Sequence, residues 1–295
     1  MKSKISLISA MLIFGSIGLF VRQIPMSSGQ TALARGVIGS LFLLAAGFLM
    51  KRKLSYKAIR QNIILLLASG CAIGFNWIFL FEAYKYTTIS NATLSYYFAP
   101  VFVIFLSPLI LKERLTKVKI SCSLCAVAGM FLIVGMDTSG AGSNPMLGIG
   151  YGLLAAGLYA SVVLMNKFLK NLSGMESTLV QLSAASVVLV PYVYLTEDSF
   201  FPRFTLNGVI MTLIVGLIHT GFAYLLYFSS LQKVSGQTAA VFSYIDPVSA
   251  IMLSSIFLNE KMGFPQMMGG ILILGATYVS EIFGKPKTVE EHTGG

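Results

Sequence analysis

Apolar residues run along the chain in ten stretches, and a short polar segment separates each stretch from the next. Each stretch has about 20 residues, the length that an α-helix needs to cross the hydrocarbon core of a bilayer. None of them alternates apolar and polar positions as the strands of a membrane barrel do. The pattern therefore predicts ten membrane-spanning helices, near residues 5–21, 30–50, 62–82, 88–111, 118–136, 146–166, 177–195, 207–230, 237–258 and 264–283.

Composition excludes the soluble classes. Apolar residues make up 56% of the 295 residues and charged residues only 11%, whereas an ordinary soluble domain has about 25% charged residues. The mean hydropathy is +0.80, and three cysteines are too few for a disulfide-rich scaffold. A disordered chain would be far more polar. The sequence therefore predicts an all-α membrane protein that crosses the bilayer several times.

The placement of lysine and arginine predicts the orientation. If the N-terminus lies in the cytoplasm, sixteen of the 21 basic residues fall in cytoplasmic segments, four fall in outer segments, and Arg35 lies within the second span. Basic residues favour the cytoplasmic side, so we expect both termini in the cytoplasm and the protein in the plasma (inner) membrane. The net charge of +10 is then an anchor to the inner leaflet and gives no support to nucleic-acid binding.

The chain repeats itself at an offset of 147 residues. Matching pairs include Gly74 with Gly221, Tyr97 with Tyr244, Pro100 with Pro247 and Glu113 with Glu260. Each half holds five predicted spans, and because five is odd, the second copy enters the membrane from the opposite side. We expect an inverted repeat of residues 1–138 and 139–284, followed by a disordered cytoplasmic tail, 285–295. Inverted repeats are typical of secondary transporters, and a duplicated scaffold without transport is the alternative.

Several short segments also resemble a known family. They are Ala83-Tyr84-Lys85-Tyr86-Thr87, Ala99-Pro100-Val101 and Leu111-Lys112-Glu113-Arg114-Leu115-Thr116, with the partner segments Leu231-Gln232-Lys233-Val234, Asp246-Pro247-Val248 and Leu258-Asn259-Glu260-Lys261. Together they resemble two copies of the EamA domain of the drug/metabolite transporter superfamily. The resemblance implies ten helices around a central cavity lined mainly by spans 1, 3, 4, 6, 8 and 9. It also implies transport of small metabolites, typically export of amino acids, amines or related compounds.

Three ionisable side chains, Arg35, His219 and Asp246, lie deep within predicted spans. Such groups are costly in hydrocarbon unless they are paired or hydrated, so each is a candidate functional residue. Asp246 can bind a substrate amine or a proton. It can equally neutralise Arg35, for which we expect a structural role. His219 is a candidate proton switch because histidine titrates near neutral pH; a hydrogen bond to a neighbouring helix is the alternative.

Aromatic residues are frequent in the expected cavity helices, where they can enclose an apolar ring or hold a cation over their faces. Many of them can instead face lipid. Tyr97 and Tyr244 are the preferred pair because they share one register of the repeat. A helical stripe joins His219 to Phe222 and Tyr227, and the repeat maps His219 to the neighbourhood of Asn76. The predicted substrate-binding residues are Phe14, Asn76, Trp77, Tyr97, Tyr159, His219, Phe222, Tyr227, Tyr244 and Asp246.

One proline and one glutamate recur at matching positions of the two halves. Pro100 and Pro247 lie within spans four and nine, where a proline kinks a helix and frees a carbonyl. We expect them to be hinges, and a static kink is the alternative. Glu113 and Glu260 lie in short turns before the following span, and we expect each to have a structural role, accepting hydrogen bonds from free amides at a helix N-terminus.

The sequence thus predicts a secondary transporter that moves a small amphipathic metabolite, an amino acid or an amine, aromatic ones included, by alternating access, with export as the expected direction. Import, or an anionic cargo such as a nucleotide sugar, is the alternative, and Arg35 exposed in the cavity would favour the anion. An intramembrane enzyme and a non-transporting scaffold are weaker alternatives. We expect no catalytic residue, metal or cofactor. The expected partners are the substrate, the bilayer and protons as a candidate coupling ion, with the protein a monomer or weak dimer.

Overall fold

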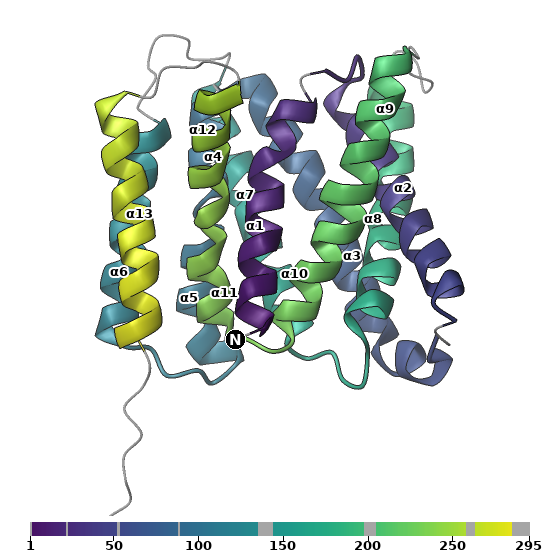
Figure 1. Ribbon diagram of the computed structural model, residues 1–295, viewed down its shortest axis with the longest axis horizontal. Helices are drawn as coiled ribbons and strands as arrows, with labels where there is room; N and C mark the ends of the chain where they lie inside the picture. Colours follow the sequence, from purple (N-terminus) through teal and green to yellow (C-terminus); the bar gives the residue numbers. More distant parts are fainter. Residues whose placement is uncertain are drawn as a thin grey trace, which may run out of the picture.

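The computed structural model describes residues 2–21, 23–51, 54–87, 89–134, 144–197, 205–257 and 263–284, and every regular element in these ranges is a helix (Figure 1). The helices are α1 (Lys2–Val21), α2 (Ser28–Leu49), α3 (Tyr56–Tyr86), α4 (Ile89–Tyr96), α5 (Ala99–Ile110), α6 (Lys117–Val134), α7 (Pro145–Asn166), α8 (Gly174–Thr196), α9 (Leu206–Ile214), the π-helix η1 (Val215–Phe222), α10 (Ala223–Leu231), α11 (Gly236–Ser243), α12 (Ile245–Phe257) and α13 (Phe264–Phe283).

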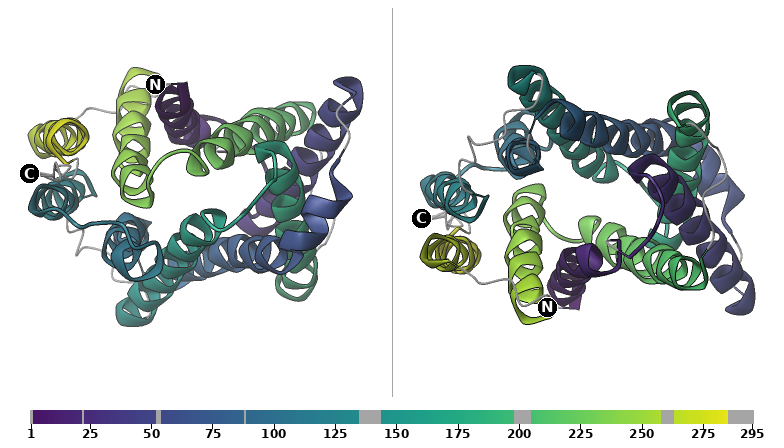
Figure 2. Two further views of the ribbon diagram at one scale, coloured as in Figure 1. Left: turned by 90° about the horizontal axis from the view of Figure 1, so that it is seen from below. Right: turned by 90° about the horizontal axis from the view of Figure 1, so that it is seen from above.

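Eight helical segments of the described chain are long and apolar enough to cross a membrane. Three of these spans consist of consecutive helices: α4 with α5, α9 with η1 and α10, and α11 with α12. The other two predicted spans correspond to α6 and α13, of which α13 includes a shorter apolar helix, Met267–Ser280. These two helices pack against each other at one side of the bundle (Figure 2).

Serine caps fix where several helices begin. Ser27 and Ser173 each form a capping box, in which the serine hydroxyl accepts from the third amide of the helix and Gln30 or Glu176 bonds back to the cap. Glu176 also accepts a hydrogen bond of 2.6 Å from the amide of Ser55. The start of α8 is thereby tied to the start of α3.

Small residues allow the helices to approach closely. A side chain on Gly70 would meet Gln181 and Ala184 of α8, and one on Gly152 would meet Ala92 and Ser95 of α4. Close backbone contact of this kind is a main source of helix association in lipid, where apolar burial contributes little.

The contacts between helices repeat in the two halves. α3 packs against α7 and α8, and its counterpart in the second half, α9–η1–α10, packs against α1 and α2. In the same way α4–α5 packs against α7, and α11–α12 packs against α1. The predicted helical membrane fold with two repeats is therefore confirmed. The predicted boundary at residues 138 and 139 and the tail 285–295 lie outside the described residues.

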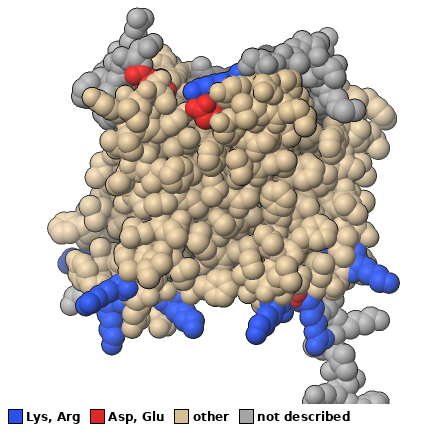
Figure 3. All heavy atoms as spheres, turned by 180° about the vertical axis from the view of Figure 1, so that it is seen from behind, with Lys and Arg blue, Asp and Glu red and all other residues tan. Residues whose placement is uncertain are grey.

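One end of the bundle is strongly basic. Lys and Arg side chains gather at the end that carries the N-terminus (Figure 3). We call this end, with Lys2, Lys57, Arg60, Lys112, Arg114 and Lys117, the basic end. The opposite end carries Glu82 and Lys85, which form an ion pair of 2.8 Å. Charge thus distinguishes the two ends of the bundle, and most of the surface between them is apolar.

Candidate functional site

A cavity of about 570 Å³ lies inside the bundle, within the size range of pockets that hold small ligands. Its walls come from α1, α3, α4, α5, α7, α10, α11 and α12, which belong to the six spans expected to line it, and from Arg35 of α2. The lining residues are Met11, Phe14, Gly15, Ile17, Gly18, Leu19, Arg35, Trp77, Leu80, Phe81, Tyr84, Thr93, Tyr96, Tyr97, Ala99, Pro100, Tyr159, Tyr224, Tyr227, Ser243, Asp246 and Ala250.

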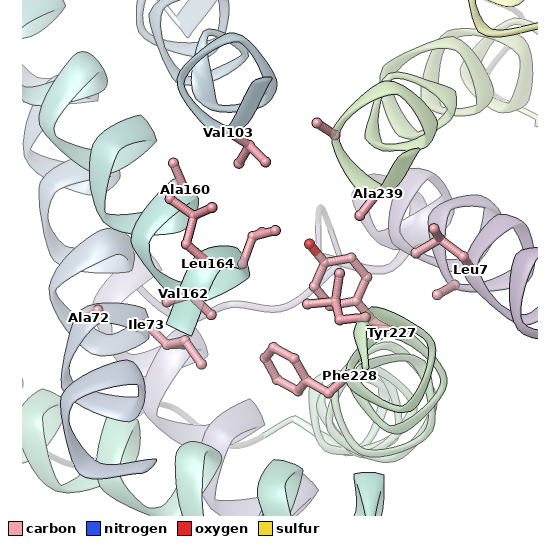
Figure 4. Close-up of a cluster of buried hydrophobic side chains, with 14 of the residues drawn as sticks. Leu7, Ala72, Ile73, Val103, Ala160, Val162, Leu164, Tyr227, Phe228 and Ala239 are labelled. Atoms are coloured by element: carbon pink, nitrogen blue, oxygen red, sulfur yellow. The ribbon is translucent and has the colours of Figure 1, made fainter. Parts of the chain in front are cut away.

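The cavity occupies the half of the bundle farther from the basic end. The lining residues of α1 begin at Met11, and those of α3 fall between Trp77 and Tyr84, near the end of that helix. Toward the basic end, buried apolar side chains fill the centre of the bundle. Side chains of α1, α3, α5, α7, α10 and α11 converge there (Figure 4). Leu7, Val103, Leu164, Phe228 and Ala239 are at most 3% exposed. The cavity is thus closed toward the basic end.

Aromatic rings form the deep end of the cavity. The hydroxyls of Tyr159 and Tyr227 form a hydrogen bond, and the two rings stack with centroids 6.2 Å apart. Phe14 meets the ring of Tyr227 edge-on at 6.0 Å, and Tyr96 meets Tyr159 in the same manner at 6.0 Å. The contacts join α1, α4, α7 and α10 at mid-depth and present both ring faces and hydroxyl groups to the cavity.

Arg35 and Asp246 are the two charged side chains among the lining residues. The guanidinium carbon of Arg35 lies 4.2 Å from the centre of the Trp77 ring, and a guanidinium nitrogen donates to the Tyr224 hydroxyl at 3.5 Å. The Nε atom of Arg35 is buried without a hydrogen-bond partner. Asp246 accepts a hydrogen bond of 3.5 Å from the Tyr97 hydroxyl. Within the described part of the chain the two charges form no ion pair with each other.

The cavity brings together many of the residues proposed from sequence. Phe14, Trp77, Tyr97, Tyr159, Tyr227 and Asp246 line it, as does Pro100. Sequence reasoning did not include Tyr84, Tyr96, Tyr224 or Ser243 in the site, and it gave Arg35 a structural role. Tyr96 and Tyr224 lie on helices that were expected to line the cavity, so their positions in the sequence were consistent with a place in the site. The orientation of the two rings was not evident from the sequence.

Two of the proposed residues, His219 and Phe222, do not line the cavity. His219 is 2% exposed and lies between helices, where Nε2 is 2.9 Å from the Ser16 hydroxyl. Phe222 is 44% exposed on the outside of the bundle. The stripe that joined them to Tyr227 assumed 3.6 residues per turn. Residues 215–222 form a π-helix, whose i→i+5 bonds shift the faces of the helix, so the stripe does not continue through it.

Three further residues lie behind the cavity wall. Asn76 is buried and donates to the carbonyl of Ala155 at 2.6 Å, joining α3 to α7. Tyr244 is fully buried in a cluster with residues of α6 and α13, including Met130 and Ile273. Pro247 is buried as well. Tyr97 faces the cavity and Tyr244 does not, so the repeat does not place these two rings in equivalent surroundings.

The prolines coincide with interruptions of the helices. The chain leaves the helix at Tyr97 and Phe98, and α5 begins one residue before Pro100. The second interruption falls at Tyr244, before Pro247. Because proline lacks an amide hydrogen, it is favoured in the first turn of a helix, where no bond is lost. Each broken span thus consists of two shorter helices that meet beside the cavity.

Glu113 connects the two halves at the basic end, and the partly buried Lys167 lies close to it within the second half. The carboxylate of Glu113 accepts hydrogen bonds of 2.7 and 3.2 Å from the amides of Gly236 and Gln237, at the start of α11. The ammonium of Lys167 donates to the carbonyls of Leu231 and Val234. Burial lowers the pKa of Lys167 to about 8, and the nearby charge of Glu113 opposes this shift. Glu260, the repeat partner of Glu113, lies outside the described residues.

Comparisons with known proteins cover nearly the whole chain. The EamA-like transporter family matches residues 1–135 and again residues 146–281. The uncharacterized transporter YxxF of Bacillus subtilis (strain 168) is 31% identical over 91% of this chain and 86% of its own length. The uncharacterized transporter YetK of the same organism is 28% identical over 96% of this chain and 87% of its own length.

A solved protein structure has the same fold. It superposes on 94% of this chain and 96% of its own chain with a TM-score of 0.81, at 19% identity. The two matched segments of the sequence correspond to the two repeats whose contacts mirror each other, and the cavity lies between them. The chain is a membrane transporter and belongs to the EamA-like transporter family.

Proposed function

We propose that the protein moves a small amphipathic metabolite, an amino acid or an amine, across the plasma membrane by alternating access, with export as the direction. The observation that carries the proposal is the cavity itself. It is walled by aromatic rings, holds the carboxylate of Asp246 and is closed toward the basic end. Aromatic faces and a carboxylate are groups that bind a cationic or apolar part of a small ligand.

The basic end supports an orientation. Lysine and arginine favour the cytoplasmic side, so the basic end and both termini face the cytoplasm in our proposal. The cavity then faces the outside and the conformation is outward-open. Transport requires a second conformation in which the residues around Leu7, Val103 and Ala239 separate and the opposite end closes. The interruptions before Pro100 and Pro247 are the proposed hinges.

Proton coupling through His219 is a second part of the proposal. His219 contacts α1 through Ser16, and the neighbouring residues Phe14, Gly15 and Ile17 line the cavity. A change in the protonation of His219 would therefore act on a helix that forms the site. The ring lies outside the cavity lining, so coupling would be indirect. The protein acts as a monomer or weak dimer in this proposal, because one chain encloses the whole cavity.

The anionic cargo is the second candidate, and a specific observation favours it: the positive charge of Arg35 lines the cavity. A cationic and an anionic ligand can be told apart by the residue on which their binding depends. An amine should depend on Asp246, and an anion should depend on Arg35. Neither candidate needs a catalytic group.

Flux into proteoliposomes tests the proposed function. Proteoliposomes that contain the purified protein are loaded with one unlabelled compound from a panel of amino acids, amines and organic anions. Uptake of the same compound in labelled form is then measured as counterflow. We expect flux for at least one amino acid or amine. Asp246→Asn and Tyr97→Ala should reduce it at least tenfold, whereas the exposed Tyr194→Ala should not. Wild-type rates in both site variants would contradict the site, and flux only of anions would favour the second candidate.

A further inference from the structure

Resting on the proposed function, we infer that the substrate is a zwitterion with a carboxylate and an ammonium on one small skeleton. In this assignment Arg35 binds the carboxylate and Asp246 binds the ammonium. The inference starts from two opposite charges in one cavity that do not pair with each other. It gives Arg35 a direct role in substrate selection.

Arg35 has unused capacity for hydrogen bonds. A guanidinium carries five N–H donors in a planar fork that matches a carboxylate. One face of Arg35 is covered by the Trp77 ring, at 4.2 Å, and one nitrogen reaches the Tyr224 hydroxyl at the long distance of 3.5 Å. The buried Nε atom has no partner. An unpaired buried donor costs free energy, and a ligand carboxylate would remove that cost.

Asp246 is similarly under-bonded. Its hydrogen bond from the Tyr97 hydroxyl is also long, at 3.5 Å. A carboxylate accepts about four hydrogen bonds when fully satisfied, and an ammonium group donates three. The rings of Tyr97 and Tyr96 stand beside it, with centroids 5.9 Å apart. An ammonium at this position would meet both the carboxylate and aromatic faces.

Contacts of α1 link the surroundings of the two charges. Phe14 meets the Tyr224 ring at 5.1 Å, and Tyr224 accepts the hydrogen bond from Arg35. The next residue, Gly15, packs against the backbone of Asp246, because a side chain there would come within 2.7 Å of the Asp246 carbonyl. Arg35 and Asp246 therefore flank the segment around Phe14 and Gly15. A small ligand on this segment has one charge on either side.

A ligand with a single charge fits this cavity less well than a zwitterion does, for electrostatic reasons. An amine bound at Asp246 would leave Arg35 in a confined cavity without a counter-ion and add a second positive charge. An anion bound at Arg35 would do the same to Asp246. Unpaired charges in a low-dielectric site are costly. A zwitterion neutralises both, so the cavity selects for it and against the amine and the acid that share its skeleton.

Two matched sets of probes test this selection. One set is phenylalanine, phenethylamine and 3-phenylpropanoate. The other is leucine, 3-methylbutylamine and 4-methylpentanoate. Within each set the amine lacks the carboxylate and the acid lacks the ammonium. Binding to the purified full chain is measured by calorimetry. For wild type we expect at least one of the two amino acids to bind at least tenfold more tightly than its amine and its acid.

The variants separate the two charges. Arg35→Gln should weaken binding of the amino acid and the acid at least tenfold. It should not weaken binding of the amine and should tighten it, because a repelling positive charge is removed. Asp246→Asn should weaken binding of the amino acid and the amine at least tenfold. It should not weaken binding of the acid and should tighten it, because a repelling negative charge is removed. Arg35→Lys should keep the preference for the amino acid over the amine, and Arg60→Gln, at the exposed start of α3, should behave as wild type. Size-exclusion profiles show which variants are folded.

Defined results would overturn the inference. They are equal binding of an amino acid and its amine or acid in both sets, equal weakening of all three ligands by Arg35→Gln, or no binding by any of the six probes. The proposed function is judged separately by flux with the broader panel. Flux of an amine that does not depend on Arg35 would overturn this inference and leave the proposed function standing.

Discussion

The carboxylate of Glu113, in the first half of the chain, lies 2.7 Å from the amide nitrogen of Gly236, in the second half. Free amides at a helix start carry partial positive charge and favour a carboxylate. Sequence reasoning predicted this chemistry for Glu113, but the helix it caps is α11 rather than the one that follows it in the chain. Close by, Gln237 donates to the hydroxyl of the fully buried Ser107 at 2.9 Å. The contact therefore holds the two halves together at the basic end.

Replacing Glu113 by alanine should loosen this closure. Loss of a cap costs about 0.5–2 kcal/mol, so the conformation closed at the basic end should be less populated. The measurement is the labelling rate of Ser107→Cys by a maleimide in a background without Cys71, Cys122 and Cys125. We expect several-fold faster labelling with Glu113→Ala than without it.

The matched control is Glu82→Gln, which removes a carboxylate at the opposite end, where Glu82 bonds to Lys85 and to the Tyr192 hydroxyl. It should leave the labelling of Ser107→Cys unchanged. Equal labelling rates with and without Glu113 would show that this carboxylate does not hold the closure.

Lys167 should make stability depend on pH. Its pKa is lowered by burial from 10.5 to about 8, so between these pH values the unfolded chain binds more protons than the folded chain. Stability therefore gains from Lys167 as the pH rises through this window. We compare the Tm of wild type and Lys167→Met at pH 7.5 and 9.5. The difference obtained by subtracting the Tm of the variant from the Tm of wild type should be larger at pH 9.5 than at pH 7.5.

The exposed Lys170→Met variant is the control and should show no such change relative to wild type. A Tm difference between wild type and Lys167→Met that stays constant or falls with pH would be inconsistent with the lowered pKa.

Two glycines of α7 should respond in opposite ways to the same substitution. A Cβ on Gly152 would lie 2.7 Å from the Ser95 Cβ, whereas a Cβ on Gly150 would meet nothing within 4 Å. Gly152→Ala should lower stability by about 1–3 kcal/mol through overpacking. Gly150→Ala should be neutral or raise it by up to about 1 kcal/mol, because alanine favours helix. Thermal unfolding in detergent measures both, and an equal effect of the two variants would argue against the α4–α7 contact.

The contact between Ser16 and His219 should contribute to stability more than to ligand binding. Ser16→Ala removes the hydroxyl that lies 2.9 Å from Nε2 of the buried ring, which should cost about 1 kcal/mol. Ligand affinity should change less than threefold, since neither residue lines the cavity. Ser6→Ala, which removes only a bond within α1, is the control. A tenfold loss of affinity in Ser16→Ala would place His219 in the site.

Composition and periodicity predicted the features that depend on many residues at once. Span positions, the two repeats and the aromatic character of the cavity are of this kind. Features that depend on the geometry of one short segment could not be predicted from the sequence. The π-helix around His219 changes which side chains share a helix face, and the residue types at 215–222 do not predict a π-helix. Tyr97 and Tyr244 match in sequence but differ in surroundings. When only one end of the bundle is closed, equivalent residues of two inverted halves have different neighbours.

Alternating access is tested most directly by holding the basic end shut. In a cysteine-free background, Ser107→Cys and Gln237→Cys are joined by a short bifunctional reagent whose link can be cut by a reductant, and flux into proteoliposomes is measured before and after reduction. We expect the linked protein to bind ligand with unchanged affinity, to transport at less than a tenth of the unlinked rate, and to recover on reduction. Undiminished flux through the linked protein would contradict transport by opening of this end.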